Sequence, residues 1–143
     1  MPMIHLTSPA GALAAEARAE LMKSLPAALL KWEGAPDNAF FRAQAWCHIE
    51  EAADAGFAAL EDELARFLVK VTVPAGGLSE RRKAGLVKEV TDLILAAAGL
   101  TEADALRVWV LVHDQPEGTW GAAGTIVKFQ ELAALAQGRR ADA

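Results

Sequence analysis

Residues 67–78 read FLVKVTVPAGGL, and this stretch decides the fold. The first seven residues place phenylalanine and three valines at every second position, which is typical of a β-strand, and the strand runs into the turn residues Pro-Ala-Gly-Gly. A nearly identical ending, Pro9-Ala10-Gly11-Ala12-Leu13, follows the short strand predicted at residues 2–7. From Pro9 to Pro74 the separation is 65 residues, and the chain therefore contains an internal repeat.

A helix is predicted after each of these turns. From Ala12 onward, apolar residues recur every four positions as far as Leu29, with charged residues between them, as an amphipathic helix requires. The second helix begins after Ser79, a favourable N-cap, and its apolar stripe stops at Gly99.

Each helix is followed by a second predicted strand, at residues 41–49 and 108–112. Trp46 and Trp109 occupy corresponding places in these two strands, 63 residues apart. Between the two halves, residues 50–65 are acidic and rich in alanine, and they predict a turn followed by a short solvated helix. Each half of the chain is thus a β-α-β unit, which favours a parallel strand pair with a right-handed crossover.

The fold expected from this order is α/β, with two tandem β-α-β units forming a four-stranded mixed sheet that carries its helices on one face. Residues 1–143 form a single domain, with repeats at about 2–57 and 67–124 joined by an acidic connector at 58–66. Residues 108–112 are apolar on both faces, and oligomerisation would supply the cover that such a strand needs.

Composition narrows the classes of partner. A formal net charge of −5 argues against a nucleic-acid-binding surface, and no apolar run reaches the roughly 18 residues that span a bilayer. No signal peptide opens the chain, so the expected location is the cytoplasm. Three histidines without metal-ligand spacing and a single cysteine, Cys47, predict neither a metal site nor a cofactor.

The chain begins Met1-Pro2 at the head of the first strand. If Met1 is removed, Pro2 presents a secondary amine, and an α-amino group titrates near 8, well below any lysine. Burial or nearby cations lower that pKa further, so the amine can accept a proton at neutral pH.

These features together resemble the 4-oxalocrotonate tautomerase superfamily in its fused form, where two β-α-β units share one chain. The resemblance rests on Pro2, on Gly11 and Gly76 nine positions after the start of their strands, and most specifically on the segment VWVLVHDQPEGTWGAAG at residues 108–124. It implies that Pro2 acts as a general base or acid. Because the second repeat starts inside the chain at Phe67, it implies one proline site per chain. It also implies a homo-oligomer, a trimer. The composition predicts no membrane or nucleic-acid partner.

The resemblance further implies arginines that hold a substrate carboxylate and an aromatic residue that walls the pocket. Family members commonly carry an arginine in the loop where this chain has Ala12 and Gly77, and none stands at the strand positions of Trp46 and Trp109. The remaining candidates for binding a small carboxylate substrate are the following residues: Arg81, Arg82, Arg42, Arg107, Trp109, Trp120 and His48.

The function expected from the resemblance is a cofactor-independent tautomerase, conditional on removal of Met1. Pro2 would move a proton between the enol and keto forms of a small 2-keto acid. Two alternatives stay open at this point. One is a hydratase, dehalogenase or decarboxylase of a small unsaturated or β-keto acid, and the other is a trimeric relative that binds a ligand without turnover.

Overall fold

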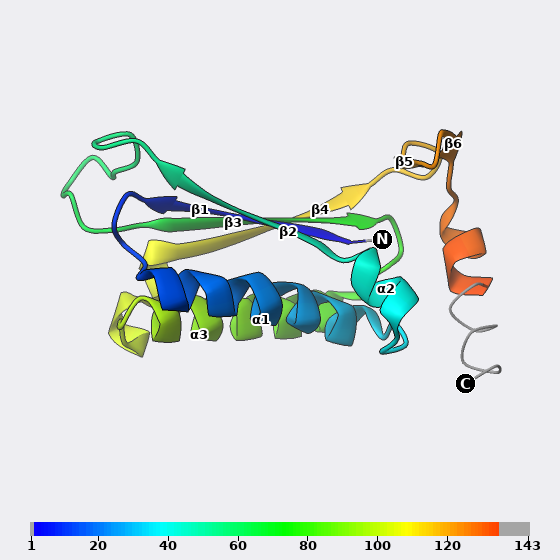
Figure 1. Cartoon of the computed structure of the whole chain (residues 1–143), viewed down its shortest axis with the longest axis horizontal. Helices are drawn as coiled ribbons and strands as arrows, with labels where there is room; N and C mark the ends of the chain where they lie inside the picture. Colours follow the sequence, from blue (N-terminus) through cyan, green and yellow to red (C-terminus); the bar gives the residue numbers. More distant parts are fainter. Residues whose placement is uncertain (1, 135–143) are drawn as a thin grey trace.

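The computed structural model describes residues 2–134 as a sheet backed by two long helices (Figure 1). In chain order its elements are β1 (Met3–Pro9), α1 (Ala15–Glu33), α2 (Ala39–Ala43), β2 (Trp46–Ala52), β3 (Phe67–Pro74), α3 (Glu80–Ala97), a 3-10 helix η1 (Glu102–Arg107), β4 (Val108–Gln115), β5 (Gly121–Ala122) and β6 (Thr125–Ile126).

The four long strands lie in the order β2-β1-β3-β4. Each repeat contributes one parallel pair, β1 with β2 and β3 with β4, and the two repeats meet through the antiparallel pair β1 and β3. The sheet is therefore mixed. Figure 1 shows α1 and α3 side by side on one of its faces, which confirms the predicted α/β fold.

Burial alternates along the strands as the sequence pattern requires. Ile4, Val69 and Val71 face the helices and are fully buried. The opposite face has no helix over it, and its large apolar side chains are open, with Trp46 exposed by 65% and Trp109 by 64%. One face of the sheet thus forms the core, while the other leaves an apolar surface uncovered in the single chain.

Two local predictions are wrong. The strand predicted from Phe41 begins only at Trp46, because Asn38 accepts a hydrogen bond from the Phe41 amide at 3.0 Å and caps the short helix α2. The helix predicted within residues 50–65 does not form. Leu60 is fully exposed and Leu64 is 54% exposed, so a helix there would have no apolar face to pack.

Gly85 in the middle of α3 allows α1 and α3 to approach each other. A Cβ at this position would overlap the Trp32 ring, which is held in place by a 2.5 Å hydrogen bond from its Nε1 to Glu89. Lys31 also reaches Glu89, at 2.8 Å. The contact between the helices is therefore tight at one identifiable point.

Replacing Gly85 with alanine is expected to destabilise the fold. Overpacking costs about 1–3 kcal/mol, whereas the better helix propensity of alanine returns about 1 kcal/mol, so we expect a net loss measurable by thermal unfolding. A Trp32→Leu background frees the space, and there the same Gly85→Ala change should be neutral or stabilising. Equal destabilisation in both backgrounds would contradict the assignment of the cost to this contact.

Candidate active site

Pro2 lies at the head of β1 and is buried. Its carbonyl accepts a hydrogen bond from the Trp46 amide at 3.1 Å, which ties it to the start of β2. Met3 is in register with Trp46 on one side and with Thr72, near the end of β3, on the other. The start of the chain therefore lies at the end of the sheet where β1 and β2 begin and where β3 and β4 finish.

A cavity of about 600 Å³ opens at this end of the sheet. Its lining residues are Pro2, Met3, Gln44, Trp46, Thr72, Gln115, Thr119, Trp120, Gly121, Ala122 and Ala123. The walls combine two indole rings and small apolar groups with amide and hydroxyl side chains, and these lining residues include no charged side chain. Such a cavity suits a small organic ligand in contact with Pro2.

The glycine-rich bend after β4 places Trp120 at this cavity. Gln115 donates from Nε2 to Thr119 Oγ1 at 2.8 Å, and Thr119 Oγ1 donates to the Pro116 carbonyl at 2.5 Å. The Val127 amide then donates to the Trp120 carbonyl at 2.8 Å. These bonds fold the bend back toward Pro2, so the prediction that Trp120 contacts a ligand is compatible with its position.

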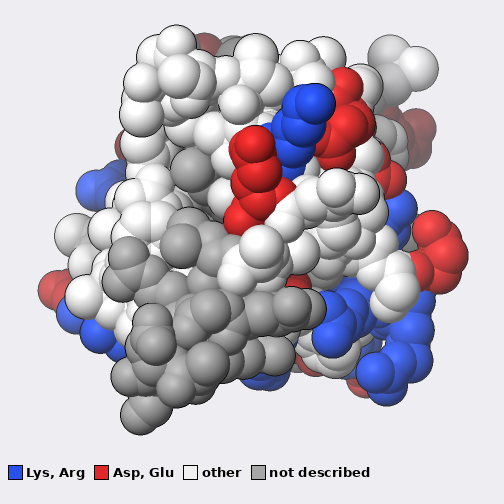
Figure 2. Space-filling model, turned by 90° about the vertical axis from the view of Figure 1, so that its right-hand side faces the viewer, with Lys and Arg blue, Asp and Glu red and all other residues white. Residues whose placement is uncertain are grey.

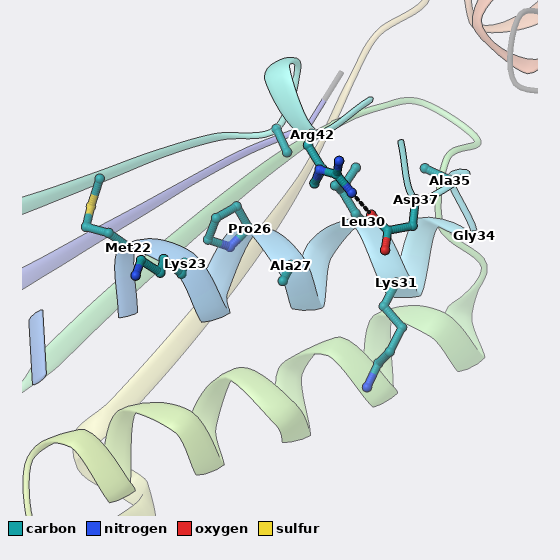
Figure 3. Close-up of a pocket in the computed structure, with 11 residues that line it drawn as sticks. Met22, Lys23, Pro26, Ala27, Leu30, Lys31, Gly34, Ala35, Asp37 and Arg42 are labelled. Carbon is teal, nitrogen blue, oxygen red and sulfur yellow. Dashed lines mark hydrogen bonds and ion pairs between the residues drawn. The ribbon is translucent and has the colours of Figure 1, made fainter. Parts of the chain in front are cut away.

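Three of the predicted arginines lie at the same end of the molecule as Pro2 but do not line its cavity. Arg82 donates to the Glu33 carbonyl at 3.1 Å, and Arg42 is paired with Asp37 at 2.6 Å. Arg42 lines a separate cavity of about 770 Å³ between α1 and α2, where it points toward Asp37 (Figure 3). Arg81 is exposed in the first turn of α3.

The surface at this end of the molecule likewise shows where the positively charged side chains lie. Figure 2 looks at this end of the molecule, and most of the Lys and Arg atoms visible there lie in the lower half, on the side of the helical layer. In this view most of the visible cations therefore lie beside the helices, and no cation is among the residues that line the cavity of Pro2.

Arg107 and Trp109 lie at the opposite end of the sheet, where β3 and β4 begin. Trp109 is in register with Leu68, next to the start of the second repeat, and Arg107 donates to the Ala65 carbonyl at 2.8 Å and to Asp104 at 3.3 Å. A single chain thus brings neither residue to Pro2.

His48 stands on the open face of the sheet. Its ring stacks on that of His5 at 4.6 Å, and His5 contacts Glu50 at 3.2 Å. His48 lines a shallow recess beside Trp46 but not the cavity of Pro2. The structure therefore gathers Pro2 and Trp120 from the predicted set and places the other candidates elsewhere.

Glu33, the last residue of α1, is a candidate that sequence reasoning missed. Burial raises the pKa of its carboxyl to about 7. In the sequence, Glu33 merely precedes the helix-ending Gly34, and only the packing of the α1 end against the loop after β3 reveals the shift. A carboxyl that titrates near neutral pH beside the proline end of the sheet is a functional candidate.

The other titratable features are less suggestive. Burial raises the pKa of the Cys47 thiol to about 11, so it is not a nucleophile at neutral pH. Residues 2–134 contain no group of three or more side chains that could hold a metal ion. Over the same residues, no helix is long and apolar enough to cross a membrane.

Comparison with known proteins supports the tautomerase resemblance. The family model described as "Tautomerase enzyme" matches residues 68–130, within the second half of the chain. Comparison with curated protein sequences finds no match.

Solved structures match over nearly the whole chain. A fused 4-OT protein, described as a wild-type symmetric trimer, is 25% identical, with 96% of this chain and 99% of that chain covered and a TM-score of 0.72. Pt0534, in a structure inactivated by 2-oxo-3-pentynoate, is 19% identical, with coverage of 92% and 98% and a TM-score of 0.74. Macrophage migration inhibitory factor from Oncomelania hupensis is 11% identical, with coverage of 99% and 94% and a TM-score of 0.74.

A mixed sheet of two β-α-β units backed by two helices defines a tautomerase-like fold. The second half of the chain matches the tautomerase family model, and the whole chain shares its fold with a fused 4-OT structure. As in that structure, both repeats of this chain lie in one polypeptide.

Proposed function

We propose that this protein is a cofactor-independent tautomerase in which Pro2, freed of Met1, moves a proton between the enol and keto forms of a small 2-keto acid. The observation that carries the proposal is the position of Pro2 in the wall of a 600 Å³ cavity flanked by Trp46 and Trp120. A proline amine in such surroundings is a tunable proton carrier.

The proposed reaction needs only this amine. The neutral nitrogen of Pro2 accepts the enol O–H proton, the double bond shifts as the carbonyl forms, and the resulting ammonium returns the proton to carbon. The indole rings make part of the cavity wall apolar, which favours the neutral form of the amine. Gln115 and Thr119 supply amide and hydroxyl groups at the same wall to orient the oxygens of the substrate.

We further propose that the working form is a homo-oligomer, a trimer. The open sheet face carries Trp46, Trp109 and Leu111, each at least 51% exposed, which is the kind of apolar surface that a second copy covers. A fused 4-OT structure that resembles this chain is described as a trimer. In such an assembly the candidates that a single chain keeps away from Pro2, including Arg107 and Trp109, could reach the cavity of a neighbour.

A second function has one observation in its favour. Hydration, dehalogenation or decarboxylation of a small unsaturated or β-keto acid would use Pro2 in its protonated form. Such reactions need an additional polar group that holds or activates water, and the wall of the Pro2 cavity supplies Gln115 and Thr119.

The test is a sequence of three measurements on the native protein. Intact mass should show a chain that lacks Met1, and that chain should accelerate the ketonisation of a small 2-hydroxy-dienoate followed by ultraviolet absorbance. A conjugated alkynyl keto acid such as 2-oxo-3-pentynoate should then add once per chain to the Pro2 amine and abolish turnover. Retained Met1, or trimmed protein that is not labelled and gives no acceleration, would leave a ligand-binding relative without turnover as the better description.

A further inference from the structure

A second cavity lies between α1 and α2, apart from the cavity of Pro2 (Figure 3). Its volume of about 770 Å³ is within the range of cavities that hold small organic ligands. The two cavities share no lining residue. Arg42 and Ala45 line the one between the helices, whereas Gln44 and Trp46 line that of Pro2. The chain from the end of α2 to the start of β2 therefore separates two distinct cavities.

The wall that α1 contributes to this cavity is mostly apolar. Met22, Pro26 and Leu30 follow one another at a spacing of four residues, so their side chains lie on the same face of the helix. Ala27 beside them adds only a methyl group. Met22 is 42% exposed, and this part of the wall thus stays open in the single chain. The wall offers apolar contact to the body of a ligand.

Arg42 bounds the cavity on the side of α2, where its guanidinium reaches toward Asp37 (Figure 3). Their 2.6 Å bond is the one hydrogen bond that this guanidinium makes with residues 2–134. The two side chains are 59% and 86% exposed, and an ion pair so open to water contributes little to stability. Asp37 can therefore turn to water, and the planar guanidinium can bind the carboxylate of a ligand through two parallel N–H bonds.

The other charged residues of the wall also favour an anion. Lys23 makes no hydrogen bond or ion pair with any residue that the structure describes. Lys31 is neutralised by Glu89 at 2.8 Å, and its side chain points away from the cavity toward α3 (Figure 3). Asp37 is the one acidic side chain among the lining residues. The cavity wall is thus positively charged in a chain whose formal net charge is −5.

We propose that this cavity is a second binding site, which takes a small carboxylic acid with an apolar body. The acid group binds the guanidinium of Arg42, and the apolar body packs along Pro26 and Leu30. A ligand that is anionic at one end and apolar elsewhere matches both the cation and the wall, whereas a cationic ligand matches only the wall. The site is separate from the cavity of Pro2 and does not depend on the reaction proposed there.

Two methionines allow the bound ligand to be located, because Met22 lines this cavity and Met3 lines that of Pro2. In protein labelled with methyl-¹³C methionine, octanoate should shift the NMR signal of the Met22 methyl group in a saturable manner and leave that of Met3 unchanged. Octylammonium has the same tail and the opposite charge, and it should bind about tenfold or more weakly. No saturable shift at Met22, saturation at Met3 alone, or equal affinity for the two compounds would overturn the proposal.

Two pairs of variants test the contacts, all at side chains that are exposed in the chain, so that the fold is expected to persist. Arg42→Gln should weaken octanoate binding about three- to tenfold, because a charge-assisted contact is lost. Lys88→Gln removes the same charge from α3 outside the cavity and should bind like the wild type. Ala27→Leu fills the cavity with a good helix former and should abolish the saturable shift, whereas Ala19→Leu, on the same helix outside the cavity, should retain it. Undiminished binding in either Arg42→Gln or Ala27→Leu would overturn the proposal.

Discussion

Replacing Pro2 with alanine is expected to lower kcat/KM for enol ketonisation by about 10²- to 10⁴-fold, which is the usual contribution of a positioned general acid or base. Alanine keeps a terminal amine once Met1 is removed, but it loses the ring that packs at the head of β1. The remaining primary amine is freer to rotate and is no longer held against the cavity walls formed by Trp46 and Trp120. The measurement is the initial rate of ketonisation at several pH values.

This prediction needs a control for folding and a control for chemistry. Trp46 bonds to the backbone carbonyl of residue 2, which alanine also provides, so thermal unfolding of Pro2→Ala should stay close to that of the wild type. Pro36→Ala is the same substitution at an internal position outside the cavity, where no amine is changed, and it should keep full activity. Equal rates for wild type and Pro2→Ala in folded protein would remove Pro2 from the reaction and, with it, the proposed mechanism.

The strands and their pairing could be predicted because their signal is local and repeated. The apolar alternation at residues 67–73 and the similar strand and turn near Pro2 can be recognised without knowledge of the rest of the chain. The structure places these strands in one mixed sheet. The helix α2 was missed for the opposite reason. Its first turn is capped by one hydrogen bond that the Phe41 amide donates to Asn38, and this bond outweighs the apolar alternation that predicts a strand from Phe41.

The site was harder to predict because side-chain direction depends on packing. The sequence places Arg82 correctly at the start of a helix near the proline end, but packing turns its guanidinium to the carbonyl that ends α1. Arg107 and Trp109 follow a helix in the second repeat, just as Arg42 and Trp46 follow one in the first. Because β1 and β3 are antiparallel, however, Arg107 and Trp109 lie at the end of the sheet far from Pro2. A repeat predicts which residues are equivalent in the two halves, but the sheet topology decides at which end of the sheet each of them lies.

Glu33 shows the same limit in its electrostatics. A glutamate at the end of an amphipathic helix is ordinarily a solvated charge, and nothing in its neighbours along the chain indicates otherwise. Its raised pKa arises from burial, and Gly77, in the loop after β3 and more than 40 residues later in sequence, lies close to its carboxyl. Such a shift becomes visible only when the two repeats are packed together.

The second large effect is expected at Phe67, which begins the second repeat as Pro2 begins the first. Phe67 is 2% exposed and in register with Val108, which is 6% exposed. Phe67→Ala removes most of a fully buried side chain, and we expect the free energy of unfolding to fall by about 3–5 kcal/mol. Urea denaturation at fixed protein concentration measures it, because subunit association would otherwise change the apparent stability.

The loss of stability in Phe67→Ala tests whether the two ends of the sheet have different roles. If Phe67 serves packing where Pro2 serves chemistry, Phe67→Leu should recover much of the stability, and its ketonisation rate per folded chain should match that of the wild type. Leu106→Ala, changed at a side chain that is 89% exposed, should stay within about 0.5 kcal/mol of the wild type. A Phe67→Ala variant that is as stable as Leu106→Ala would mean that the second repeat does not depend on this residue for its core. A stable Phe67→Leu that loses turnover would instead place a functional site at both ends of the sheet.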